Sequence, residues 1–187
     1  RRGIRAAAAS TFPFIGTDFR STFEPRVSRE QQRTMVRVRV VTPSYFQVTG
    51  TIATRGRVLT ADDAGAHRMA VTDAFATSVL PDRDVIGRRV GQNLEWTVLG
   101  VTPPVRQFAV NEEAQPEAYI LYEDLLELRP DMAARVMRGA YILAETTPGI
   151  TATLQIVRAV VREQMPEFTI RSASPVDEII RRGVGTN

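Results

Sequence analysis

The stretch TMVRVRVVTPSYFQVTG, residues 34–50, has the clearest structural pattern in the chain. Its first half alternates valines with arginines, which is typical of a β-strand with one buried and one solvated face. Pro43 ends this strand and can occupy the first turn of a short helix over residues 44–47. Gly50 then breaks the pattern. We therefore expect a strand and a short helix, with Tyr45 and Phe46 as core residues.

Further strands and helices are predicted on both sides of this stretch. Short strands are predicted at residues 69–72, 88–90, 95–101, 117–122, 139–144 and 168–171, with the second and third forming a hairpin. Helices are predicted at residues 74–80, behind an Asp73 cap, and at 123–128, 151–165 and 175–180. Strand, helix and strand recur at both chain ends, which indicates an α+β architecture. Composition shifts near Gly50 and Asn111 suggest that one subdomain is inserted between two halves of another.

The composition of the 187 residues is that of an ordinary folded domain, with 43% hydrophobic and 24% charged residues. There is no cysteine, which excludes disulfides, thiolate catalysis and cysteine-based zinc sites. There is no lysine either, which excludes ATP hydrolysis by a P-loop. The longest apolar runs fall short of the roughly 20 residues that a membrane helix needs.

Arginine is concentrated between residues 26 and 39, where there are five arginines and a single acidic residue, Glu30. Such a stretch can bind an anionic partner, either nucleic acid or anionic lipid. The alternative is a solvated face in a protein with an arginine-biased composition. No aromatic or glycine-rich nucleic-acid motif accompanies the stretch, which favours the solvated face and predicts no nucleic-acid partner.

The single histidine, His67, lies beside Arg68 in a polar loop that also holds Asp62 and Asp63. A hydrolytic site would need a nucleophile or an orienting carboxylate near the histidine. A metal site would need three or four ligands, and one histidine with two adjacent carboxylates is a poor set. We therefore predict a surface loop, with no catalytic, cofactor or metal residues. An enzyme that uses His67 with Asp62 or Asp63 stays open as a further hypothesis.

Several motifs follow one another in a recognisable order. They are Thr42 to Phe46, Gly50, Arg55 to Arg57 with Asp62 and Asp63, Met69 to Ala76, Val85 to Arg88, Trp96 to Val101 and Glu117 to Tyr122. This order resembles the MacB-like periplasmic core domain of FtsX/MacB-type ABC-transporter permeases, from about Ala6 to about Ile180. The order and spacing of the motifs together carry this resemblance. Leu121 and the turn at residues 102–105 depart from the family pattern.

The resemblance implies a fold and a function. The fold is a Porter-like subdomain of βαβ units from both chain ends, residues 1–50 and 116–187, with an inserted strand-rich Sabre-like subdomain, residues 51–115. The function is that of a periplasmic domain of an integral inner-membrane permease in a bacterium. The domain would relay ATP-driven motion of the membrane helices to a periplasmic partner or substrate during export or efflux, and would not be an enzyme.

The resemblance also implies partners. These are the permease's own transmembrane helices, a cytoplasmic ATPase domain or subunit and a periplasmic membrane fusion protein, within a dimeric transporter whose isolated domain is monomeric. The candidate contact residues lie in two loops: Asp62, Asp63, His67 and Arg68 in the first, and Asn111, Glu112 and Glu113 in the second. The alternative function is a stand-alone arginine-rich binding module for an anionic partner.

Overall fold

The computed structural model describes residues 4–11, 20–23, 34–79, 84–91, 95–103, 115–146, 150–178 and 181. The strands are β1 (Ile4–Ser10), β2 (Arg20–Phe23), β3 (Thr34–Val41), β4 (Arg55–Gly56), β5 (Arg68–Thr72), β6 (Arg89–Val90), β7 (Trp96–Thr102), β8 (Glu117–Leu121) and β9 (Tyr141–Thr146). The helices are α1 (Tyr45–Thr49), α2 (Asp73–Val79), α3 (Tyr122–Leu128), α4 (Pro130–Met137) and α5 (Ile150–Gln164), with a 3₁₀ turn, η1, at Ala61–Asp63. The predicted α+β class is confirmed. None of the helices in these ranges is long and apolar enough to cross a membrane.

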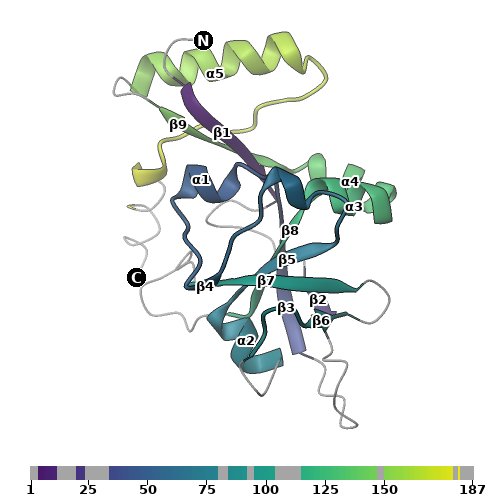
Figure 1. The fold of residues 1–187 in the computed structure, drawn as a ribbon. Helices are drawn as coiled ribbons and strands as arrows, with labels where there is room; N and C mark the ends of the chain where they lie inside the picture. Colours follow the sequence, from purple (N-terminus) through teal and green to yellow (C-terminus); the bar gives the residue numbers. More distant parts are fainter. Residues whose placement is uncertain are drawn as a thin grey trace.

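The nine strands of the described residues belong to one mixed sheet, in the order β4-β7-β5-β8-β3-β1-β9, with β2 beside β3 and β6 beside β7. Figure 1 shows this sheet crossing the molecule, with α2 near one end and α5 near the other. Strands β3 and β8 pair in parallel from Arg37 with Glu117 to Val41 with Leu121, although the whole middle of the chain separates them in sequence. The sheet thus contains strands from all three predicted segments, and the positions of the subdomain boundaries stay a prediction.

Strand β3 lies in the interior of the sheet and is covered on both faces. Val36, Val38 and Val40 belong to a large apolar core with residues of α2, β5 and β7. Val41, one position out of phase, belongs to a second core on the opposite face with Tyr45 and other residues. Tyr45 and Phe46 of α1 are 1% and 3% exposed, as the sequence predicts for core residues.

The prediction that the arginines of β3 face solvent is wrong for Arg39, which is only 1% exposed. Its side chain shares a face with Val41 and lies over the Tyr45 ring, with 6.0 Å between the guanidinium carbon and the ring centroid. The alternation of valine and arginine shows which residues share a face, but α1 covers the second face and no local pattern reveals that. Arg39 therefore does not belong to a basic surface patch.

The secondary structure agrees with most of the sequence-based assignments. Helix α2 is present, but its cap is Thr72 and not Asp73: the Thr72 hydroxyl accepts a hydrogen bond from the N–H of Phe75, the third residue of the helix, at 3.3 Å. Helix α4 is not among the predicted elements, because a proline at position 130 can end one helix as well as occupy the first turn of the next. The strand predicted at residues 168–171 is absent, since that segment has no ladder partner within the described residues.

Candidate functional site

The first predicted contact loop is organised around the carboxylate of Asp63, which is fully buried. Arg57 donates to its two oxygens at 2.6 Å each, and Arg68 donates to one of them at 2.7 Å. The backbone N–H of Thr60 adds a hydrogen bond at 2.9 Å. The hydrogen bonds from Arg57 are the main reason why the pKa of Asp63 lies well below its usual range. Asp63 thus holds the loop in shape, while its neighbour Asp62 is exposed.

His67 lies at the end of the same loop, half-buried, with a left-handed φ of 48°. Its ring meets the edge of Trp96, with 5.9 Å between the ring centroids. A second buried carboxylate lies beneath the loop: Asp124 of α3 accepts a hydrogen bond from the N–H of Gly65 at 2.6 Å. His67 also lies close enough to Asp124 to lower the pKa of its carboxyl. His67 is therefore next to Asp124, a residue from another part of the chain.

The carboxylate of Asp124 has fewer hydrogen-bond partners than that of Asp63. Its Oδ2 atom and the Nε2 atom of His67 are buried without a hydrogen-bond partner among the described residues. Burial raises the pKa of Asp124 above its ordinary value, and the hydrogen bond from Gly65 and the nearby His67 only partly offset this effect. No sequence signal pointed to Asp124, because a Glu-Asp pair at the start of a helix usually faces solvent.

The other predicted site residues fall in two groups. The side chain of Arg68 is 38% exposed and is bound to Asp63. Asn111, Glu112 and Glu113 lie outside the residues that the structure describes. Across the described ranges, no three side chains of histidine, aspartate or glutamate are placed so that they could hold a metal ion. Contact between either loop and a partner stays a prediction.

An ion pair between Arg39 and Glu117 joins β3 to β8 inside the second core. The distance between Arg39 Nε and Glu117 Oε1 is 2.5 Å, and the side chains are 2% and 4% exposed. A charge buried to this extent is strongly unfavourable unless it is paired, so removal of either partner leaves an uncompensated charge in the core. The pair therefore fixes the relative position of two strands that are distant in sequence.

A narrow junction connects β1 and β9 to the rest of the sheet. We define the junction as residues 9–11 of the β1 end and residues 40–42 of the β3 end. β1 pairs with β9 from Ile4 with Thr146 to Ser10 with Tyr141, but it pairs with β3 only at Ser10 and Val41. Figure 1 shows the result: β1 and β9, which we call the β1–β9 unit, extend away from the strands around β3 toward the end of the molecule where α5 lies.

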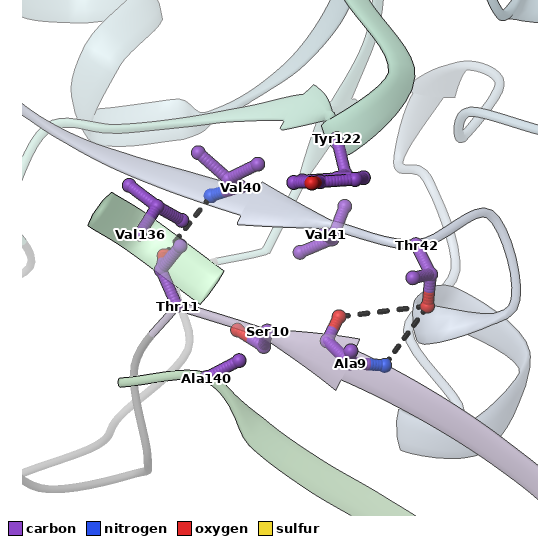
Figure 2. A pocket seen from close by; sticks show the side chains of 9 residues that line it. All are labelled: Ala9, Ser10, Thr11, Val40, Val41, Thr42, Tyr122, Val136 and Ala140. Carbon is purple, nitrogen blue, oxygen red and sulfur yellow. Dashed lines mark hydrogen bonds between the residues drawn. The ribbon is translucent and has the colours of Figure 1, made fainter. Parts of the chain in front are cut away.

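Threonine hydroxyls supplement the few backbone hydrogen bonds at the junction, as Figure 2 shows. The hydroxyl oxygen of Thr42 accepts from the N–H of Ala9 at 2.9 Å, and that of Thr11 accepts from the N–H of Val40 at 3.1 Å. The backbone adds one bond from Thr11 to Val40 and one from Thr42 to Ala9, each 3.0 Å long. Strands β1 and β3 diverge beyond these bonds. Their described residues form no ladder longer than this one.

A small apolar cavity accompanies the junction. Val136 of α4, Ala140 and Tyr122 of α3 line it together with residues of the junction (Figure 2). Its volume is about 10 Å³, which is room for one water molecule at most. It is too small for a ligand. The junction therefore offers no room for a small-molecule ligand.

Comparison with known proteins identifies relatives of this fold. Residues 4–178 match the family described as MacB-like periplasmic core domain. The periplasmic region of MacB from Actinobacillus actinomycetemcomitans is similar in structure, with a TM-score of 0.67 and 14% identity over 100% of this chain and 79% of that chain. No curated protein matches the chain in sequence.

Two further solved structures have similar folds. The extracellular domain of the noncanonical ABC-type transporter YknZ from Gram-positive bacteria has a TM-score of 0.58 and 14% identity, over 87% of this chain and 76% of that chain. A domain of a permease protein from Porphyromonas gingivalis has a TM-score of 0.61 and 13% identity, over 96% of this chain and 83% of that chain. At such identities, these likenesses show the fold alone.

Proposed function

The chain belongs to the family of MacB-like periplasmic core domains of ABC-transporter permeases, and from this premise we propose that it acts mechanically, by relaying ATP-driven motion of the membrane helices to a periplasmic partner or substrate. In the intact transporter, a cytoplasmic ATPase domain or subunit drives those helices. A periplasmic membrane fusion protein, docked on the loop of Asp62 and His67, is the partner that we propose.

The junction is the observation that carries this proposal. A relay needs two firm bodies and an element between them that has more than one arrangement. On one side, the ladder of six residue pairs between β1 and β9 is firm. On the other, β3 and β8 pair over five residues and carry the buried ion pair. Between the two bodies, β1 and β3 share a single residue pair, so bending here disturbs few ladder hydrogen bonds.

Helix α1 supports the same proposal, because it contacts both bodies. Its buried residues Tyr45 and Phe46 pack in the second core, while Ser44, just before the helix, donates to the carbonyl of Ala7 in β1 at 2.7 Å. A movement of the β1–β9 unit therefore pulls on α1 directly. From α1, the chain continues into the loop that holds the predicted partner contacts.

The proposal is tested by measuring the distance between the two bodies in the full-length permease with its ATPase. Spin labels on Thr77→Cys in α2 and Gln155→Cys in α5 report across the junction, and both positions are exposed. We expect the label distance to change when ATP binds. The matched pair, Thr77→Cys with Leu126→Cys in α3, lies on one side of the junction and should keep its distance.

Two results would refute the relay. The first is a distance across the junction that is the same with and without ATP, in a transporter that still hydrolyses ATP. The second is an equal change in both label pairs, which would mean that the domain deforms as a whole. A full-length gene without hydrophobic spans beside this segment would instead contradict its place in a permease.

A further inference from the structure

A groove lies between α1 and the loops on either side of β4, away from the junction. Its volume is about 580 Å³, within the range of roughly 300–1,000 Å³ in which small-molecule sites fall. The buried side chains of Phe46 and Leu59 contribute to its wall, together with the half-buried Val58. Ile52 also lines it and is 77% exposed. The groove is thus wide, open to solvent and largely apolar.

The chemistry of the lining restricts the ligand. None of the described residues that line the groove carries a charge; its polar groups are hydroxyls and one amide, from Ser44, Thr51, Thr60 and Gln47. The nearest arginines are engaged elsewhere, since Arg57 is bound to Asp63 and Arg55 is paired with Asp73 at 3.7 Å. A charged ligand would lose its hydration here without gaining an opposite charge.

We propose that this groove binds a small, uncharged amphiphile, with its apolar body against Phe46, Ile52 and Val58 and its polar end at the hydroxyl and amide groups of the rim. An apolar ligand body would cover the exposed Ile52 side chain, and the removal of that apolar surface from water favours binding. An uncharged polar end finds hydrogen-bonding groups such as the exposed Gln47 amide without any need for a counter-charge. This inference goes beyond the mechanical relay and does not depend on it.

The probe is N-phenyl-1-naphthylamine, an uncharged aromatic amine that fluoresces when it enters an apolar site. Titration against the purified chain should give saturable binding with a micromolar Kd. Ile52→Glu places a carboxylate in the groove and should raise the Kd by about tenfold or more. Gln47→Glu is nearly isosteric, leaves the apolar lining intact and should also weaken binding. The anionic analogue 1-anilinonaphthalene-8-sulfonate should bind less tightly than the uncharged probe.

Ile142→Glu is the matched control, because Ile142 is also an exposed isoleucine, at 49%, but lies on β9 outside the groove. It should leave the Kd unchanged. The proposal is overturned by the absence of saturable binding, by equal weakening in Ile52→Glu and Ile142→Glu, or by tighter binding of the anionic probe. Dimerisation that depends on concentration and is lost in Ile52→Glu would assign the groove to a second copy of the chain instead. Far-ultraviolet circular dichroism verifies that each variant is folded.

Discussion

At the scale of single residues, one loop is held by two buried carboxyl groups whose pKa values are shifted in opposite directions. Asp63 receives charged hydrogen bonds from Arg57 and Arg68, so its pKa is lowered. Asp124 accepts a backbone hydrogen bond from Gly65 and has no arginine partner among the described residues, so burial dominates and its pKa is raised. A charge that is paired stabilises the folded state, whereas a buried charge without a cation opposes folding.

Replacement of Asp124 with asparagine should therefore stabilise the protein at neutral pH. Because the pKa of Asp124 is higher in the folded than in the unfolded state, its contribution to stability is greatest at low pH and is lost as the pH rises through the folded-state value. Asparagine removes the charge but keeps an oxygen that can accept from Gly65. We expect the Tm of Asp124→Asn to exceed that of the wild type at pH 7, with a smaller difference near pH 4. Thermal melts at both pH values measure this.

Asp131→Asn is the matched control for this experiment. Asp131 is exposed on α4, and its hydrogen bond with Arg129 lowers its pKa. Its replacement should give no increase in Tm at pH 7. An Asp124→Asn variant whose Tm is no higher than that of the wild type at pH 7 would contradict the account of Asp124.

At the scale of elements, the pairing of β4 with β7 depends on close contact between two backbones. A Cβ atom added to Gly100 in β7 would lie 2.1 Å from the carbonyl oxygen of Arg57. Gly56 in β4 faces Gly100 and has a φ of 65°, a left-handed conformation that glycine adopts without strain. The short strand β4 can lie against β7 only because both positions lack a side chain.

Gly100→Ala should therefore destabilise the fold by about 1–3 kcal/mol, the usual cost of overpacking, because the neighbouring atoms belong to rigid backbone. Urea denaturation followed by circular dichroism measures the change in the free energy of unfolding. Gly139→Ala serves as control, since a methyl group at that position would have no atom of the described residues within 4 Å. Equal stability of the Gly100→Ala variant and the wild type would show that β4 is not held against β7 in solution.

At the scale of the whole molecule, the junction is the short ladder that joins the β1–β9 unit to the rest of the sheet. A disulfide across the junction should lock them together. Ser10 and Val41 are paired between antiparallel strands, and the bonds from Thr11 to Val40 and from Thr42 to Ala9 enclose them, so they form a non-hydrogen-bonded pair whose side chains are close. The chain has no native cysteine that could form a competing disulfide.

Oxidation of the Ser10→Cys/Val41→Cys variant should raise the stability of the isolated chain by about 3–4 kcal/mol, since it closes a loop of roughly thirty residues. In the full-length transporter, the lock should leave ATP hydrolysis intact but abolish the ATP-dependent change in amide hydrogen exchange across β1 and β9. Reduction of the disulfide should restore that change.

The Ala7→Cys/Ala144→Cys variant joins β1 to β9 within one part and is the matched control. Its oxidation should leave the ATP-dependent exchange as in the wild type. If the locked variant and this control behave alike, motion at the junction does not carry the signal.

The sequence by itself determined the types and order of most elements and the family. The valine alternation of β3, the Thr42–Phe46 turn into α1 and the hairpin of β6 and β7 are local patterns, set by backbone geometry and by which residues share a face. The order of motifs along the chain indicated a permease domain, and the family match over residues 4–178 confirms it.

Only the tertiary structure decided which charges are buried and where the sheet is weakly joined. Arg39 meets Glu117, and Asp124 meets the His67 loop, across distances in sequence that no local pattern records. The segment at residues 168–171 has the side-chain pattern of a strand. Among the described residues, however, it has no neighbouring strand to pair with. Contacts of this kind arise from packing between distant segments, so the junction, the groove and both buried carboxylate sites became visible only in the folded chain.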